Sequence, residues 1–290
     1  MTPPPASDFR ASPAHAPIGI FDSGLGGLSV LRAVRERLPD EALVYVADSR
    51  HAPYGPREDA FIAERTLAIG EWLAARGAKA LVVACNTATA QSIALVRERL
   101  PIPLVGVEPG IKPAAQHSKT RIAGVLATQA TLRSARFGAL IARYAADCRF
   151  ICQAGHGLVE AVERGDTGSP ELRALLAGYL EPMLAAGADT LVLGCTHYPF
   201  FDAAIRDVTS NRLHLIDTSD AIARQLSRIL DERDLRAPAG SRPAPPPRLC
   251  STGDGRQLQS LAATLLGLDV PAESVTISSP NTAAPAAHPA

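Results

Sequence analysis

One short pattern occurs twice in this chain, and it constrains the fold more than any other feature. Its two copies are residues 81–87, LVVACNT, and residues 191–197, LVLGCTH. Each is an apolar run that ends at a small residue, a cysteine and polar residues, which is typical of a buried parallel strand. Because open α/β sheets bind ligands at the carboxyl ends of their strands, Cys85 and Cys195 should both lie at such an edge. Two similar halves would then place two thiols on opposite walls of one cleft.

Two facing thiols indicate a particular chemistry, in which one thiol removes a proton from one face of a carbon and the other returns a proton to the opposite face. A thiol near a helix N-terminus or a histidine has its pKa lowered from about 8.5 toward neutrality. A predicted helix start follows Cys85 and Cys195, and His197 lies two residues after Cys195. A single Cys-x-His pair is more often structural, but the repetition favours paired acid–base thiols.

Strand and helix patterns alternate along the chain, which predicts α/β architecture with mostly parallel sheets and helices on both faces. The predicted strands cover 18–21, 43–47, 81–84, 104–107, 121–127, 149–153, 191–194, 213–216 and 248–252. The predicted helices cover 28–38, 57–76, 89–100, 134–144, 158–163, 171–186 and 257–266. The pattern restarts near residue 121, so we expect two similar doubly wound halves.

Composition limits the classes of function. The chain has 290 residues, of which 47% are hydrophobic and 20% charged, so it can bury a core. Its formal net charge is zero, which argues against nonspecific nucleic-acid binding. We find no secretory signal and no apolar run near the roughly 20 residues that span a bilayer, so we expect a soluble, cytoplasmic protein with no membrane partner. The five cysteines should be free thiols, with Cys148 and Cys250 as small buried side chains.

Three other kinds of site deserve comparison. Residues 22–27, DSGLGG, resemble a phosphate loop but lack the third glycine of GxGxxG, so a tight strand-to-helix turn facing a carboxylate fits better. Cys85, Cys195 and His197 could in principle bind zinc, but no further Cys or His pair follows at finger-like spacing. A pyridoxal cofactor is disfavoured because the chain has only three lysines, of which Lys79 precedes its strand, at the edge opposite the expected cleft. We therefore expect neither a metal nor a cofactor.

The chain resembles a known family through five motifs that occur in family order between about residues 18 and 218. They are FDSGLGG at 21–27, Asp48 with PYG at 53–55, ACNTA at 84–88, GVEPG at 106–110 and LGCTHYP at 193–199. The segment STGD at 251–254 continues the likeness to about residue 270. The family is that of the cofactor-independent glutamate racemases of bacterial cell-wall synthesis. Related aspartate and hydantoin racemases share the two cysteines but usually not the full set.

The resemblance implies two α/β domains related by a pseudo-dyad, with glutamate in the cleft between them. The first domain would comprise residues 17–110 plus 220–270 and the second residues 111–219. Independently of the resemblance, the composition of the two ends predicts a disordered leader at residues 1–16 and a disordered tail at residues 271–290. A homodimer is possible, and the product D-glutamate would serve peptidoglycan synthesis.

The resemblance also implies roles for individual residues. Cys85 and Cys195 would be the two bases, one for each enantiomer, assisted by Asp22 and His197 respectively. Substrate contacts are expected from Asp22, Ser23, Tyr54, Gly55, Asn86, Thr87, Thr196 and His197. Asp48 and Glu160 would be auxiliary residues. The loop before Glu160 reads AGH at 154–156, where many family members have Ala-Cys-Pro.

The sequence leaves two other functions open. One is a related racemase that acts on another amino acid. The other is a binding or regulatory protein on the same scaffold, although a protein that only binds needs neither thiol.

Overall fold

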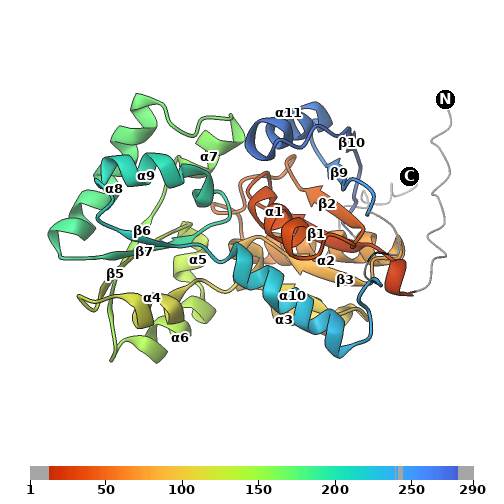
Figure 1. The fold of residues 1–290 in the computed structure, drawn as a ribbon, viewed down its shortest axis with the longest axis horizontal. Helices are drawn as coiled ribbons and strands as arrows, with labels where there is room; N and C mark the ends of the chain where they lie inside the picture. The colour runs from red at the N-terminus through yellow and green to blue at the C-terminus, as the bar shows by residue number, and fades with distance from the viewer. Residues whose placement is uncertain (1–12, 239, 241–243, 280–290) are drawn as a thin grey trace, which may run out of the picture.

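The structure is a computed structural model that describes residues 13–238, 240 and 244–279, and its chain forms two sheets that lie side by side (Figure 1). The elements up to residue 117 are η1 Pro13–His15, β1 Ile18–Asp22, α1 Leu28–Arg37, β2 Leu43–Ala47, α2 Asp59–Ala75, β3 Ala80–Val83, α3 Asn86–Arg99, β4 Leu104–Gly106 and α4 Ile111–His117. Those up to residue 216 are β5 Ile122–Ala127, α5 Gln129–Arg133, α6 Ala135–Tyr144, β6 Arg149–Ala154, α7 Leu158–Glu163, α8 Pro170–Ala185, β7 Thr190–Gly194, η2 Tyr198–Phe201, α9 Asp202–Val208 and β8 His214–Ile216. The remainder are α10 Ser219–Glu232, β9 Arg248–Ser251, α11 Gly255–Leu266 and β10 Ala272–Ser274.

The two sheets share one strand order. The larger sheet runs β10-β9-β2-β1-β3-β4 and the smaller β6-β5-β7-β8. In the larger sheet β1 lies between β2 and β3, with β4 beside β3. In the smaller sheet β5 lies between β6 and β7 in the same way, with β8 beside β7. All pairings among the described strands are parallel. The predicted α/β class with two parallel sheets is confirmed, and the repeated stretches form β3 and β7, the third strand of each set.

Helices cover both faces of each sheet because the strands carry apolar side chains on both faces. In the larger sheet, Ile18 and Ile20 face the cluster with α1, α10 and α11, while Phe21 and Val83 face α2 and α3. In the smaller sheet, one face packs on α7, α8, α9 and η2, and the other on α4 and α6. The strand ends are thereby held rigidly, which fixes the residues that follow them.

The chain crosses from the larger sheet to the smaller after β4 and returns after β8. On its return α10 packs against α1, and β9 then adds to β2 (Figure 1). The sheets therefore occupy the parts of the chain expected for two domains, and folding of each part as a separate domain stays a prediction.

The expected disordered tail is wrong for its first part. β10 pairs in parallel with β9, and Val275 N donates to Ser251 O at 2.7 Å. Ile277 and Ser279 are buried, because the chain here folds back onto the apolar face of α2. At the other end, η1 and buried Ala16 belong to the expected leader. Residues 1–12 and 280–290 lie outside the described residues.

The structure confirms one smaller expectation and changes another. Cys148 and Cys250 are buried among apolar side chains, as predicted. The helix expected at 89–100 begins earlier, at Asn86, directly after Cys85. Within the described part of the chain, no helix combines the length and apolar character that crossing a bilayer requires.

Candidate functional site

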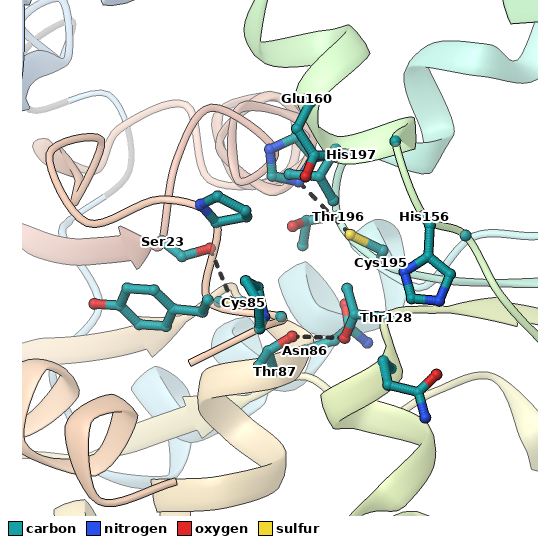
Figure 2. A pocket seen from close by; sticks show the side chains of 18 of the residues that line it. Ser23, Cys85, Asn86, Thr87, Thr128, His156, Glu160, Cys195, Thr196 and His197 are labelled. Atoms are coloured by element: carbon teal, nitrogen blue, oxygen red, sulfur yellow. Dashed lines mark hydrogen bonds between the residues drawn. The ribbon is translucent and has the colours of Figure 1, made fainter. Parts of the chain in front are cut away.

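A cavity of about 280 Å³ lies between the two sheets and is lined from both sides (Figure 2). The larger-sheet half contributes Ser23, Pro53, Tyr54, Gly55, Pro56, Cys85, Asn86 and Thr87. The smaller-sheet half contributes Thr128, Gln129, Arg133, Gly155, His156, Gly157, Val159, Glu160, Cys195, Thr196 and His197. Most of these residues follow the carboxyl ends of β1, β2, β3, β5, β6 and β7, where open parallel sheets bind ligands.

Cys85 is the N-cap of α3, and its sulfur accepts a hydrogen bond from Ala88 N at 3.4 Å. The Cys85 thiol donates to Ser23 Oγ at 3.3 Å, and Ser23 Oγ donates to Asp22 Oδ1 at 3.4 Å. Burial, and after it the charge of Asp22, raises the pKa of Cys85 to about 12. The Cys85 thiol is therefore protonated at neutral pH, and it begins a polar chain that runs through Ser23 to Asp22.

Cys195 has a different set of partners, although its strand has the same place in its sheet. The chain after it forms η2 rather than an α-helix, and this turn brings His197 Nδ1 within 3.6 Å of Cys195 Sγ. His197 Nε2 lies 2.7 Å from Glu163 Oε1 at the end of α7. Burial lowers the pKa of His197, but the hydrogen bonds to Cys195 and Glu163 outweigh burial and hold that pKa well above its usual range. These two contacts therefore favour the imidazolium form of His197.

The glycine-rich loop at 22–27 packs directly under these groups, which explains its composition. A Cβ on Gly24 would overlap the carboxylate of Glu163, and a Cβ on Gly26 would overlap the ring of His197. Leu25 N instead donates to Glu163 Oε1 at 2.7 Å. The glycines thus make room for side chains of the other half, and no phosphate is needed to account for them.

Further hydrogen bonds join the halves beneath the cavity. Thr196 Oγ1 donates to Asp22 Oδ2 at 2.8 Å, and Ser29 Oγ donates to Thr196 O at 3.1 Å. Burial raises the pKa of Asp22, and the nearby His197, the Gly24 amide and the Thr196 hydroxyl offset only part of this effect. Asp22 itself lies below the cavity wall rather than in it.

The cavity offers donors that can bind an anion. Asn86 is 4% exposed, and its Nδ2 is one of two buried side-chain atoms without a hydrogen-bond partner among the described residues. Leaving a buried donor unpaired costs about 1–3 kcal/mol, which a ligand oxygen would recover. Thr87 follows Asn86 on α3, and its Oγ1 lies 2.8 Å from Thr128 Oγ1, which donates to Thr131 Oγ1 at 2.9 Å. This hydroxyl row crosses the cleft (Figure 2).

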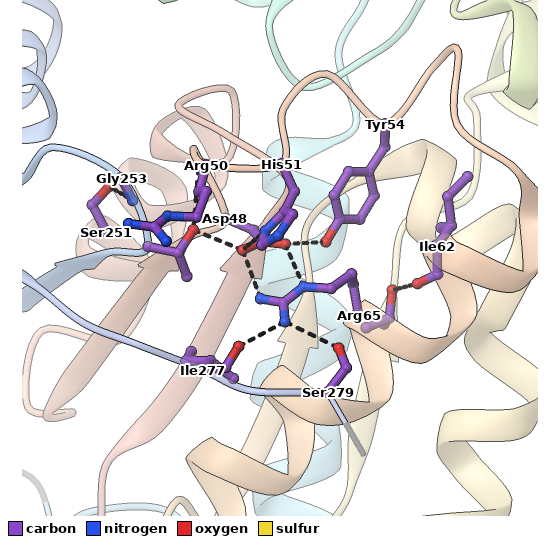
Figure 3. A network of polar contacts seen from close by, with 12 residues as sticks. Asp48, Arg50, His51, Tyr54, Ile62, Arg65, Ser251, Gly253, Ile277 and Ser279 are labelled. Carbon is purple, nitrogen blue, oxygen red and sulfur yellow. Dashed lines mark hydrogen bonds and ion pairs between the residues drawn. The ribbon is translucent and has the colours of Figure 1, made fainter. Parts of the chain in front are cut away.

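Tyr54 and Asp48 are arranged differently from the expectation. The Tyr54 ring lines the cavity, but its hydroxyl points away and donates to Asp48 Oδ2 at 2.6 Å (Figure 3). Asp48 is 0% exposed and lies behind the wall, where Arg65 contacts both of its oxygens at 3.0 and 2.8 Å. Burial raises the pKa of Asp48, but the donors from Arg65 and Tyr54 outweigh it and hold the pKa below its usual range. Asp48 is thus a buried carboxylate that anchors Tyr54.

Of the expected site residues, the cavity wall brings together Ser23, Tyr54, Gly55, Cys85, Asn86, Thr87, Glu160, Cys195, Thr196 and His197. Asp22 and Asp48 support that wall from behind. The contact with His197 comes from Glu163, one turn beyond Glu160 on the same helix face. Sequence reasoning missed Glu163, Thr128, Thr131 and Arg65. The carboxylates at 160 and 163 share a spacing that marks one face, so that signal was present for Glu163.

Among the described residues, no group of three or more His, Cys, Asp and Glu side chains is arranged to hold a metal ion. Cys85 and Cys195 instead end separate polar chains on either side of the cavity.

The sequence and the fold were both compared with those of known proteins. The family described as Asp/Glu/Hydantoin racemase matches residues 27–226. A glutamate racemase of Ralstonia nicotianae is 58% identical over 254 residues, which is 88% of this chain and 91% of that protein. A crystal structure of Escherichia coli glutamate racemase with L-glutamate and the activator UDP-MurNAc-Ala superimposes with a TM-score of 0.80 at 34% identity, covering 91% of this chain and 99% of that one. A Francisella tularensis glutamate racemase in complex with D-glutamate gives a TM-score of 0.79 at 26% identity, covering 91% and 99%.

Proposed function

We propose that this chain interconverts L-glutamate and D-glutamate. It belongs to the Asp/Glu/Hydantoin racemase family and is an amino-acid racemase, which is the premise of this proposal. The observation that carries this proposal is the pair of buried cysteines, one from each sheet, that line one cavity. Similar proteins from Escherichia coli and Francisella tularensis were solved with L-glutamate and D-glutamate respectively, which supports the choice of substrate.

The polar groups of the cavity suit an amino acid with two carboxylates. The unpaired Asn86 amide and the Thr87 hydroxyl are candidate donors to the substrate. The hydroxyls of Ser23 and Thr196 donate to Asp22, so they are candidate acceptors for the substrate's ammonium group. The Tyr54 hydroxyl is already taken by Asp48, so Tyr54 contributes its ring and main chain. Gly55 lies at the same wall. Donors fixed in a site that excludes water stabilise the negative charge that develops when the α-proton leaves.

The reaction follows from the two sulfurs. One cysteine, as thiolate, takes the α-proton and becomes a thiol, and the electron pair stays on the substrate as a carbanion-like state stabilised by the donors. The other cysteine, as thiol, gives its proton to the opposite face and becomes a thiolate. An imidazolium beside a sulfur favours the thiolate, so His197 assists Cys195. Asp22 assists Cys85 through Ser23. No cofactor takes part in this scheme.

The wider setting follows the family resemblance. The D-glutamate would supply peptidoglycan synthesis, in the cytoplasm. Assembly into a homodimer stays a prediction, which light scattering of the purified protein checks.

The decisive experiment incubates the protein with L-glutamate in D2O without added cofactor, following optical rotation and α-deuterium by NMR. We expect rotation to fall to zero as deuterium enters Cα. Exchange with aspartate but not glutamate would identify a related racemase for another amino acid. A folded, reduced sample that exchanges no amino acid would identify a binding protein and overturn the proposal.

A further inference from the structure

The C-terminal strap, which we define as residues 275–279, lies behind one wall of the cavity rather than in it. Together with Arg50, His51, Phe61 and Thr252 it encloses a second space of about 220 Å³ on the far side of Asp48. Ile277 anchors the strap, since its side chain is 7% exposed and belongs to the same apolar cluster as Tyr54 and Cys85. The strap is thus part of the same packed body as the Cys85 wall.

Arg65 connects the strap to Asp48 (Figure 3). Its Nη1 donates to Ile277 O at 2.7 Å and to Ser279 Oγ at 3.1 Å. Its Nε and Nη2 donate to the two oxygens of Asp48, and the Arg65 side chain is only 4% exposed. A planar guanidinium with all these bonds made has one orientation, so the strap fixes Arg65 and Arg65 fixes Asp48.

Asp48 passes this constraint to the cavity wall. Besides Arg65, it accepts from Thr252 Oγ1 at 2.7 Å, lies 3.0 Å from His51 Nδ1 and accepts from Tyr54 at 2.6 Å. The Tyr54 ring packs between Phe21 and Phe61, each with centroids 6.3 Å from it. The hydroxyl bond therefore sets how far the ring stands into the cavity, beside Cys85.

We propose that Arg65 and the C-terminal strap are positioning elements for the active-site wall, acting on Tyr54 through Asp48. Neither Arg65 nor the strap lines the cavity, so neither touches a substrate. This proposal rests on the proposed racemase activity for its kinetic readout. Misplacing a wall by about 1 Å can cost about 10²-fold in rate, so loosening one of several supports should cost about tenfold in kcat/KM.

The test compares two truncations. Ending the chain after Ser274 removes the strap, whereas ending it after Ser279 keeps the strap and is the matched control. We expect the first to lose about tenfold in kcat/KM for glutamate and the second to keep more than half. Arg65→Lys, which retains the charge but not the forked geometry, should resemble the first truncation and remain folded by circular dichroism.

A double-variant cycle with Tyr54→Phe separates positioning from general weakening. If the strap acts through the Tyr54 hydroxyl, its removal should cost little, less than about twofold, once that hydroxyl is absent. Losses that multiply in the double variant would overturn the proposal.

Hydrogen exchange provides a readout that needs no activity. Removing the strap should speed exchange in the peptide covering 48–56 and leave the peptide covering 195–201 unchanged. Equal acceleration in both peptides, or none at 48–56, would contradict positioning. If the intact chain does not racemise glutamate, the proposed function fails, while this exchange experiment still decides the role of the strap.

Discussion

The two cysteine sites begin from the same topology and end with different chemistry. Cys85 and Cys195 each follow the third strand of a set ordered in the same way. Each begins a two-step polar chain to a carboxylate, Cys85 through Ser23 to Asp22 and Cys195 through His197 to Glu163. The group between sulfur and carboxylate, which we call the relay, is the hydroxyl of Ser23 in the first chain and the imidazole ring of His197 in the second. The repeated fold therefore places the sulfurs, and the residues that follow the strands decide how each sulfur holds its proton.

This difference means that the two protonation patterns of the site are unequal. Burial raises the pKa of Cys85 to about 12, so its proton stays on sulfur, whereas beside Cys195 the raised pKa belongs to His197. Each turnover exchanges the roles of the sulfurs, and the charge must then reside at Cys85. The donors of α3 and the substrate's own charged groups have to offset that cost.

The largest expected effect comes from removing either sulfur. Cys85→Ala and Cys195→Ala should each lose racemisation in both directions, by at least the ~10²–10⁴-fold that a general acid or base contributes. Polarimetry from either enantiomer measures this. Cys148→Ala, which removes a buried thiol far from the cavity, is the control and should keep its activity. Substantial turnover by either single variant would falsify the two-thiol mechanism.

The second prediction uses the relay to tell the sulfurs apart. Because the enantiomers have equal free energy, kcat/KM must fall equally in both directions in any variant. His197→Asn should lower it by about 10²-fold. It should also raise the α-deuterium isotope effect only with the enantiomer that Cys195 deprotonates, since only that step loses its support. A rise of equal size with both enantiomers would mean that His197 serves both sulfurs.

The third prediction concerns the carboxylate behind the relay. Glu163→Gln removes one cause of the raised pKa of His197, so the imidazolium should be lost at lower pH. The alkaline limb of the kcat/KM profile should move to lower pH. The protonated histidine also stabilises the fold, and this stability, which is lost as pH rises through the folded-state pKa, should be lost at lower pH in the variant. We expect a loss of about tenfold at pH 8, less than full general acid–base catalysis supplies. Glu160→Gln is the control, and its limb should stay in place.

The smallest effects test the glycines. Gly24→Ala pushes against Glu163 and should lower kcat/KM by about tenfold or less, with the same shift of the pH profile as Glu163→Gln. Gly178→Ala, on the exposed face of α8 with no neighbour near the added methyl, should leave activity unchanged and add about 0.5–1 kcal/mol of stability. Thermal unfolding and steady-state rates distinguish the two. An unshifted profile in Gly24→Ala would separate that glycine from the Glu163 contact.

How much of this could be predicted from the sequence depends on how local the signal is. The strands ending at Cys85 and Cys195 were predictable because an apolar run and its terminal residues are contiguous. Arg65 was not, because it lies within a largely apolar helix and its partner Asp48 is distant in sequence. Ile277 was also missed, since an Ala-, Pro-, Ser- and Thr-rich segment has little periodicity, and only the tertiary contact with α2 buries it.

The partners of His197 show the same limit at closer range. Sequence alone marked Glu160 on α7, but the imidazole of His197, at the start of η2, meets the last turn of α7, which presents Glu163. Two carboxylates one helical turn apart differ in position by only a few ångströms. Packing between α7 and η2, rather than the spacing of residues along α7, decides which of them contacts His197.

The late position of β9 and β10 in the chain bears on how the protein is made. Residues 122–216 contain all four described strands of the smaller sheet, so the predicted second domain should fold while the ribosome is still adding residues. Strands β1 to β4 of the larger sheet are made first, but β2 has no neighbour on its outer side until β9 and β10, within residues 248–274, have emerged. Thr252 and Ile277, which complete the surroundings of Asp48 and Arg65, arrive with them. The nascent chain therefore contains both sulfurs well before it can hold the Cys85 wall in its working position, and activity should appear only after residues 275–279 have emerged.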